Sequence, residues 1–81
     1  MTARVYITLK PGLLDAQGKT IKHALETLGF GGISGVRIGK YVEIDLGRGR
    51  AASARRDVER MCKKLLANPV IETYHIDVRE R

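Results

Sequence analysis

The sequence has 81 residues, enough for one small domain, which is predicted to span residues 1–81. Apolar residues make up 43% of the chain and charged residues 30%, which excludes a disordered protein, and no apolar run approaches the length of a membrane span. The formal net charge is +6, and the single cysteine, Cys62, excludes an internal disulfide.

The first predicted element is a strand over residues 4–10, where apolar and polar residues alternate. Its buried face would carry Val5, Ile7 and Leu9, and a Pro-Gly pair follows it. A helix is expected next, because Asp15 is a suitable N-cap and Gly29 occupies the position after a helix that favours glycine. The apolar stripe of this helix comprises Ile21, Ala24, Leu25 and Leu28.

A glycine-rich stretch leads into a second strand, predicted over residues 36–46. The apolar residues of this segment are all even-numbered, and only Lys40 breaks the set. A hairpin turn at Gly39 and Lys40 would send the residues on either side of it to opposite faces. The unbroken parity therefore favours one long strand that can bend at Gly39.

A second helix is predicted after a loop over residues 47–50, and Asn68-Pro69 ends it. Its apolar stripe comprises Ala54, Val58, Met61, Cys62 and Leu65. A last strand is expected over residues 70–78, with Val70, Tyr74, Ile76 and Val78 in phase. The order β-α-β-α-β predicts an α+β fold of two layers, in which both amphipathic helices cover one face of a small antiparallel sheet.

The other face of this sheet is predicted to be open and polar. It would carry Arg4, Tyr6, Thr8, Arg37, Tyr41, Glu43, Thr73, His75 and Asp77. An oligomer is expected, because the core of so small a domain barely offsets the entropy of folding, and neither a disulfide nor a metal site is evident. The open face and the bend at Gly39 are therefore candidate contact surfaces. The candidate subunit-interface residues are Tyr6, Arg37, Lys40 and Tyr41.

No catalytic, cofactor or metal site is predicted in this chain. Residues 12–20 resemble a phosphate-binding loop, but five residues separate their two glycines where that motif needs four. A turn followed by a capped helix is the preferred interpretation. The soft metal ligands are Cys62, His23 and His75. They lie far apart in sequence, and none has a neighbour that suggests a catalytic triad or a metal site.

Most of the net positive charge lies in residues 48–64, where seven Arg and Lys residues are opposed by only two acids. One interpretation is a small nucleic-acid-binding module that uses the basic second helix. The other is a solvated helix face, which such charge runs usually form. Binding of RNA on a sheet relies on stacking aromatic residues. The two tyrosines of the open face stand among acids, so nucleic acid is ranked second.

Three stretches resemble the PurS family, in order and at the same spacing. They are LKPGLLDAQGK at residues 9–19, AL, LGF and VRIGK within residues 24–40, and MC and LLANPVIE within residues 61–72. Ala16 stands where the family often has proline, and Arg48 and Arg50 fall where it is often more acidic.

The resemblance implies a non-catalytic small subunit of phosphoribosylformylglycinamidine synthase, an ATP- and glutamine-dependent ligase of de novo purine biosynthesis. Such a subunit bridges the synthetase PurL and the glutaminase PurQ and supports ammonia transfer to formylglycinamide ribonucleotide. The complex, rather than this chain, is expected to use ATP and magnesium. A homodimer or a dimer of dimers is also implied, and the lone cysteine agrees with a cytoplasmic location.

Overall fold

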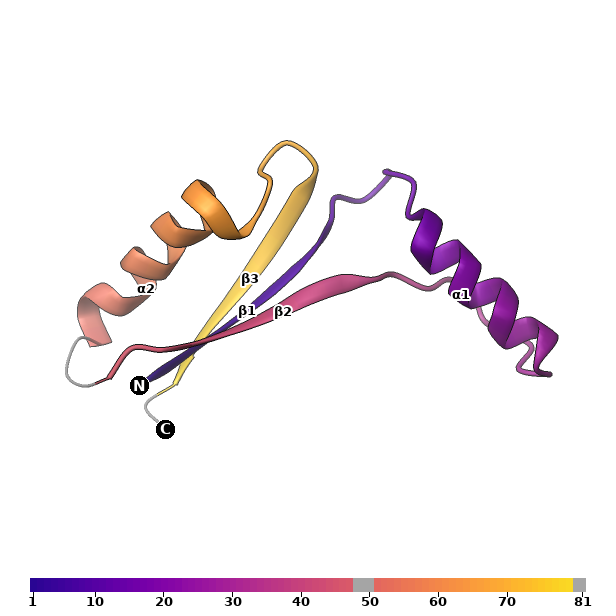
Figure 1. Ribbon diagram of the computed structural model, residues 1–81, viewed down its shortest axis with the longest axis horizontal. Helices are drawn as coiled ribbons and strands as arrows, with labels where there is room; N and C mark the ends of the chain where they lie inside the picture. Colours follow the sequence, from indigo (N-terminus) through magenta and orange to yellow (C-terminus); the bar gives the residue numbers. More distant parts are fainter. Residues whose placement is uncertain (48–50, 80–81) are drawn as a thin grey trace.

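The computed structural model describes residues 1–47 and 51–79 of the chain. Its elements are β1 (Thr2–Leu9), α1 (Ala16–Thr27), β2 (Gly39–Asp45), α2 (Ala51–Met61), a π-helical turn η1 (Cys62–Leu66) and β3 (Glu72–Arg79) (Figure 1). The predicted order of strands and helices and the α+β class are confirmed. Arg48 and Arg50 of the basic segment lie outside the described residues.

The three strands form one antiparallel sheet in the order β2-β1-β3. Because β1 is the central strand, its inward side chains Ala3, Val5 and Ile7 are almost fully buried. Val5 lies opposite Val42 of β2 on one side and Ile76 of β3 on the other. The odd-numbered residues of β1 therefore share the core face of the sheet with the even-numbered residues of β2 and β3. The core therefore lies between β1, β3 and α2.

Each strand end differs from the sequence expectation by one to three residues, and the starts of the second and third strands have identifiable causes. The second strand is one uninterrupted strand, as its parity predicted, but it begins at Gly39 because the Ile38 N–H is used by the Asp15 carboxylate instead. The last strand begins at Glu72 rather than residue 70. Asn68 stabilises the preceding turn with two hydrogen bonds. Its side-chain oxygen accepts one from the Val70 N–H, and its backbone carbonyl accepts the other from the Glu72 N–H.

The second helix ends in a way that periodicity did not predict. An α-helix continued through this region would bury Leu65 beside Val58 and Cys62. Instead the last turn is π-helical, with the Ala67 N–H donating to the Cys62 carbonyl at 3.0 Å. The wider turn rotates the residues that follow it, so Leu66 packs against the core and Leu65 is 84% exposed. The prediction that Leu65 belongs to the buried stripe is wrong.

The first helix does not lie on the sheet of its own chain. α2 packs against β1 and β3, whereas α1 lies beyond the end of the sheet (Figure 1). The chain measures 49 × 28 × 15 Å and its radius of gyration is 16.1 Å, while a compact domain of this length has a radius of gyration of about 12 Å. The prediction that both helices cover one face of the sheet therefore fails within a single chain.

Substitution of Gly39 tests the close contact between β1 and β2. A Cβ at Gly39 would overlap the carbonyl oxygen of Ile7, whereas a Cβ at Gly35 would meet nothing within 4 Å. We expect Gly39→Ala to lower the free energy of unfolding by about 1–3 kcal/mol, because the two backbones must move apart. Gly35→Ala, the matched control, should change it by less than about 1 kcal/mol. Urea denaturation at equal protein concentrations measures both, and equal losses would contradict the expectation.

Candidate assembly surfaces

Residues 10–38 form an arm that carries α1 away from the sheet and returns to β2. Asp15 closes the base of this arm with both of its carboxylate oxygens. Oδ1 accepts the Gly18 N–H at 2.8 Å and so caps α1, as the sequence predicted. Oδ2 accepts the Ile38 N–H at 2.8 Å, across 23 residues of sequence. One side chain therefore fixes both the start of the helix and the chain that returns from it.

Two further contacts stiffen the base of the arm. The Arg37 guanidinium donates to the Leu9 carbonyl at 2.6 Å. Gly18, in the first turn of α1, lies so close to the returning chain that a Cβ there would overlap the Val36 carbonyl oxygen. Residues 12–20 are thus a turn and a capped helix, and this interpretation of the glycine-lysine stretch is confirmed.

The surroundings of Asp15 favour its charged form. The N–H groups of Ile38 and Gly18 hold the pKa of the carboxyl below its ordinary value of 3.8, and the positive charge of Arg37 lowers it further. Loss of solvent around the carboxyl opposes these effects but is outweighed by the first two. Asp15 is therefore a carboxylate at any pH at which the protein would work.

The far end of α1 is closed by a glycine, as predicted. Gly29 has φ +101°, and its N–H donates to the Glu26 carbonyl at 3.0 Å while the Phe30 N–H donates to the Leu25 carbonyl at 3.0 Å. This is the Schellman arrangement, which returns the chain toward the last turn of the helix. The stripe of α1 and the residue that follows it are poorly covered, since Leu28 is 72% and Phe30 59% exposed.

The open face of the sheet forms a second candidate surface. The rings of Tyr6 and Tyr41 lie 5.2 Å apart, and the ring of His75 lies 6.2 Å from that of Tyr6. Arg4 pairs with Glu43 at 3.8 Å, and the Tyr41 hydroxyl donates to Glu43 at 3.1 Å. The predicted polar face with two tyrosines is confirmed, except that Arg37 lies in the arm rather than in a strand.

The Tyr41 hydroxyl is held as a neutral donor. Loss of solvent and the hydrogen-bonded Glu43 carboxylate raise its pKa above the ordinary value of 10.0. The face therefore offers aromatic surface together with fixed charges, which suits a polar protein interface better than the binding of a phosphate polymer.

The four candidate interface residues do not form a single patch. Tyr6 and Tyr41 lie side by side on the open face, with their rings tilted by 37°. Arg37 lies at the base of the arm. Lys40 points to the opposite, helix-bearing side, where its Nζ lies 3.4 Å from the Leu66 carbonyl and 4.0 Å from Glu72. The sequence holds a signal for this orientation, because Lys40 is even-numbered like the inward-facing residues Val42 and Ile44 of the same strand.

The residues with reactive side chains lie apart from one another. Cys62 is buried in the core, where burial first and Glu59 second raise the pKa of its thiol. His23 lies on α1, and His75 on the open face of β3. Across residues 1–47 and 51–79 there is no group of three His, Cys, Asp or Glu side chains placed to hold a metal ion. The same residues include no helix long and apolar enough to cross a membrane.

The sequence model of PurS, described as phosphoribosylformylglycinamidine (FGAM) synthase, matches residues 2–80. The chain belongs to the PurS family. It is 42% identical to phosphoribosylformylglycinamidine synthase subunit PurS of Bacillus subtilis, over 95% of this chain and 90% of the relative. It is 44% identical to the PurS subunit of Methanocaldococcus jannaschii, over 96% of this chain and 94% of that protein.

Solved structures of PurS have the same shape. The crystal structure of Methanocaldococcus jannaschii PurS matches with a TM-score of 0.88 at 42% identity, over 99% of this chain and 96% of that one. Bacillus subtilis PurS matches with a TM-score of 0.86 at 40% identity, over 98% of both chains. Because these matches include the arm, its extended placement belongs to the shape that the PurS family shares.

One match comes from an assembly. A chain in the structure of PurLQS from Thermotoga maritima is similar to this one, with a TM-score of 0.81 and 26% identity over 95% of this chain and 96% of that chain.

Replacement of Asp15 tests the clamp at the base of the arm. Asp15→Asn keeps one acceptor oxygen for the cap of α1 but puts an amide group in place of the other, so one of the two hydrogen bonds is lost. We expect a lower Tm at neutral pH, and a larger loss for Asp15→Ala, which removes both bonds. Glu26→Gln is the control, because it neutralises a surface acid that pairs only within α1.

The pH dependence follows from the lowered pKa of Asp15. The stability that the carboxylate contributes is complete above its unfolded value near 3.8 and is lost as pH falls through the lower pKa of the folded state. The difference in Tm between the native protein and Asp15→Asn should therefore be constant above about pH 5 and shrink in more acidic buffer. A difference that grows on acidification would contradict this account of Asp15.

Proposed function

We propose that this chain is the non-catalytic small subunit of phosphoribosylformylglycinamidine synthase in de novo purine biosynthesis. The match of the PurS family over residues 2–80 carries this proposal. The similarity to a chain of the PurLQS structure from Thermotoga maritima supports a place in an assembly with PurL and PurQ. The chain would bridge these two subunits and support glutamine-dependent ammonia transfer to formylglycinamide ribonucleotide.

The positions of the reactive side chains fit a structural role. A nucleophile needs a base within hydrogen-bond reach, and the thiol of Cys62 is instead enclosed in the core with a raised pKa. The two histidines lie on different elements, one on the arm and one on the sheet. ATP and magnesium would accordingly be used by the complex, with the larger subunits providing their sites. The proposed location of the assembly is the cytoplasm.

Nucleic-acid binding by α2 is the less favoured function. Arg55, one of the basic residues of the helix, donates to the Ile76 carbonyl at 3.1 Å and so is engaged in holding α2 on the sheet. The tyrosines of the open face are accompanied by Glu43, whose charge would repel a phosphate backbone. The basic residues of α2 and η1 are better explained as the solvated side of a helix.

We assign contact with the larger subunits to the open face around Tyr6 and Tyr41. Aromatic residues are enriched at protein interfaces, and these two rings are respectively 42% and 52% exposed. The flanking Arg4 and Glu43 would set the register of a partner through complementary charge. Arg37 and Lys40 would contribute at the base of the arm and on the helix-bearing side.

A reconstitution assay tests the proposed function. Purified PurL and PurQ would be supplied with glutamine, ATP, magnesium and formylglycinamide ribonucleotide, with and without this chain, and product formation would be followed. We expect the glutamine-driven rate to depend on the chain and the ammonia-driven rate to be independent of it. A glutamine-driven rate that is the same with and without the chain would overturn the proposal.

Substitutions on the open face test which surface meets the larger subunits. Tyr6→Ala together with Tyr41→Ala should lower the glutamine-driven rate at limiting subunit concentration by about 10-fold or more, since truncation of aromatic interface anchors commonly costs at least 1–2 kcal/mol. The ammonia-driven rate should be unchanged. Lys63→Ala, which removes an exposed side chain from η1, is the control. Equal glutamine-driven rates for the double variant and the control would assign the contact to another surface.

A further inference from the structure

A cavity lies within the arm, between α1, the segment before it and the chain that returns to β2. Residues 9–14 and 34–37 line it together with the N-terminal half of α1. Its volume is about 690 Å³, which lies in the range of small-molecule sites in proteins. The hydrogen bonds of Asp15 and Arg37 join these segments, so the fold of the arm sets the shape of the cavity.

Four cations and one carboxylate line this cavity. Lys19 and Lys22 come from α1, Lys10 from the segment before it, and Arg37 from the returning chain. The carboxylate is that of Asp15, whose two oxygens already accept backbone N–H groups. Cations from three separate segments are therefore brought to one cavity, where a single acid opposes them.

Two of these cations are not paired with an acid. Among the described residues, no carboxylate oxygen lies within 4 Å of the Lys10 or Lys19 ammonium. The Lys22 ammonium lies 3.0 Å from Glu26. The Arg37 guanidinium uses one N–H for a backbone carbonyl and has further N–H groups to donate. A cavity that is lined by unpaired cations attracts an anion.

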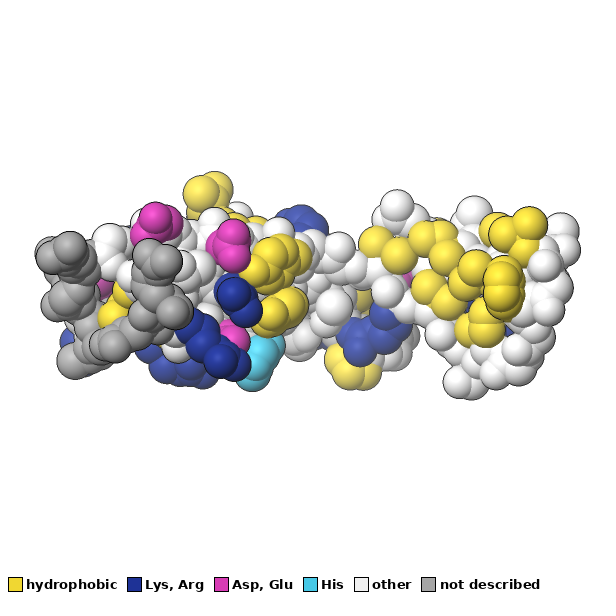
Figure 2. Space-filling model, turned by 90° about the horizontal axis from the view of Figure 1, so that it is seen from below, with side chains coloured by type: hydrophobic (Ala, Val, Ile, Leu, Met, Phe, Trp, Pro, Cys, Tyr) yellow, Lys and Arg dark blue, Asp and Glu magenta, His cyan; other side chains and the backbone are white. Residues whose placement is uncertain are grey.

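The cavity lies on the polar side of α1. Successive residues of an α-helix are about 100° apart, which places Lys19 and Lys22 on the side opposite Ala24 of the apolar stripe. Figure 2 shows the hydrophobic side chains in the region of α1 gathered on its underside. A partner that covered this apolar stripe would therefore leave the cavity open.

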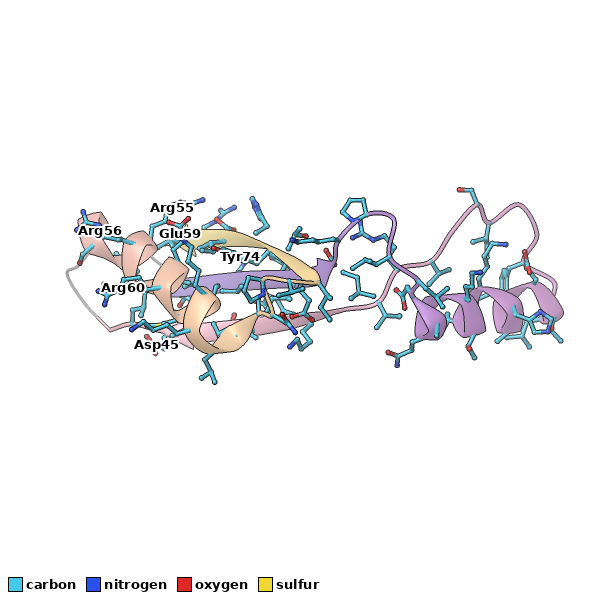
Figure 3. The ribbon with its side chains drawn as sticks, turned by 90° about the horizontal axis from the view of Figure 1, so that it is seen from above. Asp45, Arg55, Arg56, Glu59, Arg60 and Tyr74 are labelled. Atoms are coloured by element: carbon cyan, nitrogen blue, oxygen red, sulfur yellow. The ribbon has the colours of Figure 1, made fainter. Side chains whose placement is uncertain are left out.

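The basic residues of α2 do not meet at one place in this way. In Figure 3, Arg55 and Glu59 project on the side of Tyr74 of β3, whereas Arg60 projects on the side of Asp45 of β2. The positive charge of α2 is therefore distributed around the helix and mixed with acids. The arm directs its cations to a single cavity.

The chemistry of the cavity favours a phosphate ester over other anions. A phosphate monoester carries a charge of roughly −1.5 to −2 at neutral pH and three acceptor oxygens, so it can meet cations from several directions. A carboxylate offers two oxygens and one charge. Leu13 and Leu14 are exposed at the same cavity and would be left uncovered by an inorganic anion. The organic part of an ester would cover them.

We infer that this cavity binds a small organic phosphate, such as a nucleoside monophosphate or a sugar phosphate. Lys10, Lys19 and Arg37 would hold the phosphate group, and Leu13 and Leu14 would contact the organic part. The inference goes beyond the proposed function and does not rest on it. Because the ligand would contact α1 and both connections of the arm, its binding would also stiffen the base of the arm.

Calorimetric titration of the whole chain tests the inference. The probes are AMP and ribose 5-phosphate, and adenosine and ribose are the matched compounds without phosphate. We expect both esters to bind and each neutral compound to bind about 10-fold more weakly or worse, because the charge-assisted hydrogen bonds to the phosphate are lost. Equal affinities with and without the phosphate would contradict the inference.

Two double variants locate the bound ligand. Lys10→Gln together with Lys19→Gln removes two cations from the cavity, and we expect the dissociation constant of AMP to rise by about 10-fold or more. Lys63→Gln together with Lys64→Gln removes the same charge from η1 and should leave the constant within about 3-fold of the native value. All four positions are exposed, so both variants should fold, and circular dichroism checks that they do.

Neutralisation of Glu26 should have the opposite effect. Glu26→Gln removes the acid that pairs with Lys22 and so frees a fourth cation for the ligand. We expect AMP to bind about 2- to 5-fold more tightly, as is typical of an exposed ion pair. A purely structural role of the lysines would not produce tighter binding.

Three results would overturn the inference. The first is that neither ester binds at millimolar concentration, and the second is that both double variants weaken AMP binding equally. The third is that a short single-stranded oligonucleotide binds more tightly than AMP and is weakened only by the η1 variant, which would place phosphate recognition on the second helix. These titrations need neither PurL nor PurQ, so this inference and the proposed function can fail separately.

Discussion

The shape of this chain depends on one carboxylate. Asp15 accepts a hydrogen bond from the first turn of α1 and another from Ile38, just before β2 begins. These bonds join the two connections of the arm at its base, where Arg37 and the Gly18–Val36 approach hold them as well. Because the base is fixed, α1 projects away from the sheet, and the apolar surfaces on the arm and over β2 are left apart. The apolar surface of the arm is therefore left without a cover from its own chain.

The distribution of the core leads to the same conclusion. The buried hydrophobic side chains of the described residues come from β1, β3, α2 and the segments next to them. The arm, about a third of the sequence, loses conformational entropy on folding and contributes no fully buried apolar side chain. A domain of 81 residues has little stability to spare, so an ordered arm of this length requires burial in a partner. The extended shape and the small core therefore both indicate that the arm is buried by a partner.

The sequence predicted the local structure well, because the relevant signals are local. Asp15 and Gly29 mark the ends of α1, and the parity of residues 36–46 identifies β2 as a single strand. Two features could not be obtained this way. Periodicity shows which side of a helix is apolar but not what covers that side, so it cannot place α1 away from the sheet of its own chain. Leu65 is exposed where the last turn is π-helical and Leu66 packs against the core, and residue spacing predicts neither of these features.

The two faces of the sheet differ in what they can offer a partner. The helix-bearing face carries α2 on β1 and β3 and leaves Val42 and Ile44 of β2 only partly buried. The opposite face carries Tyr6 and Tyr41 with the Arg4–Glu43 pair, and these side chains already contact one another within the sheet. Side chains that are held in place before a partner binds lose less conformational entropy on binding. The open face therefore suits the proposed contact with the larger subunits.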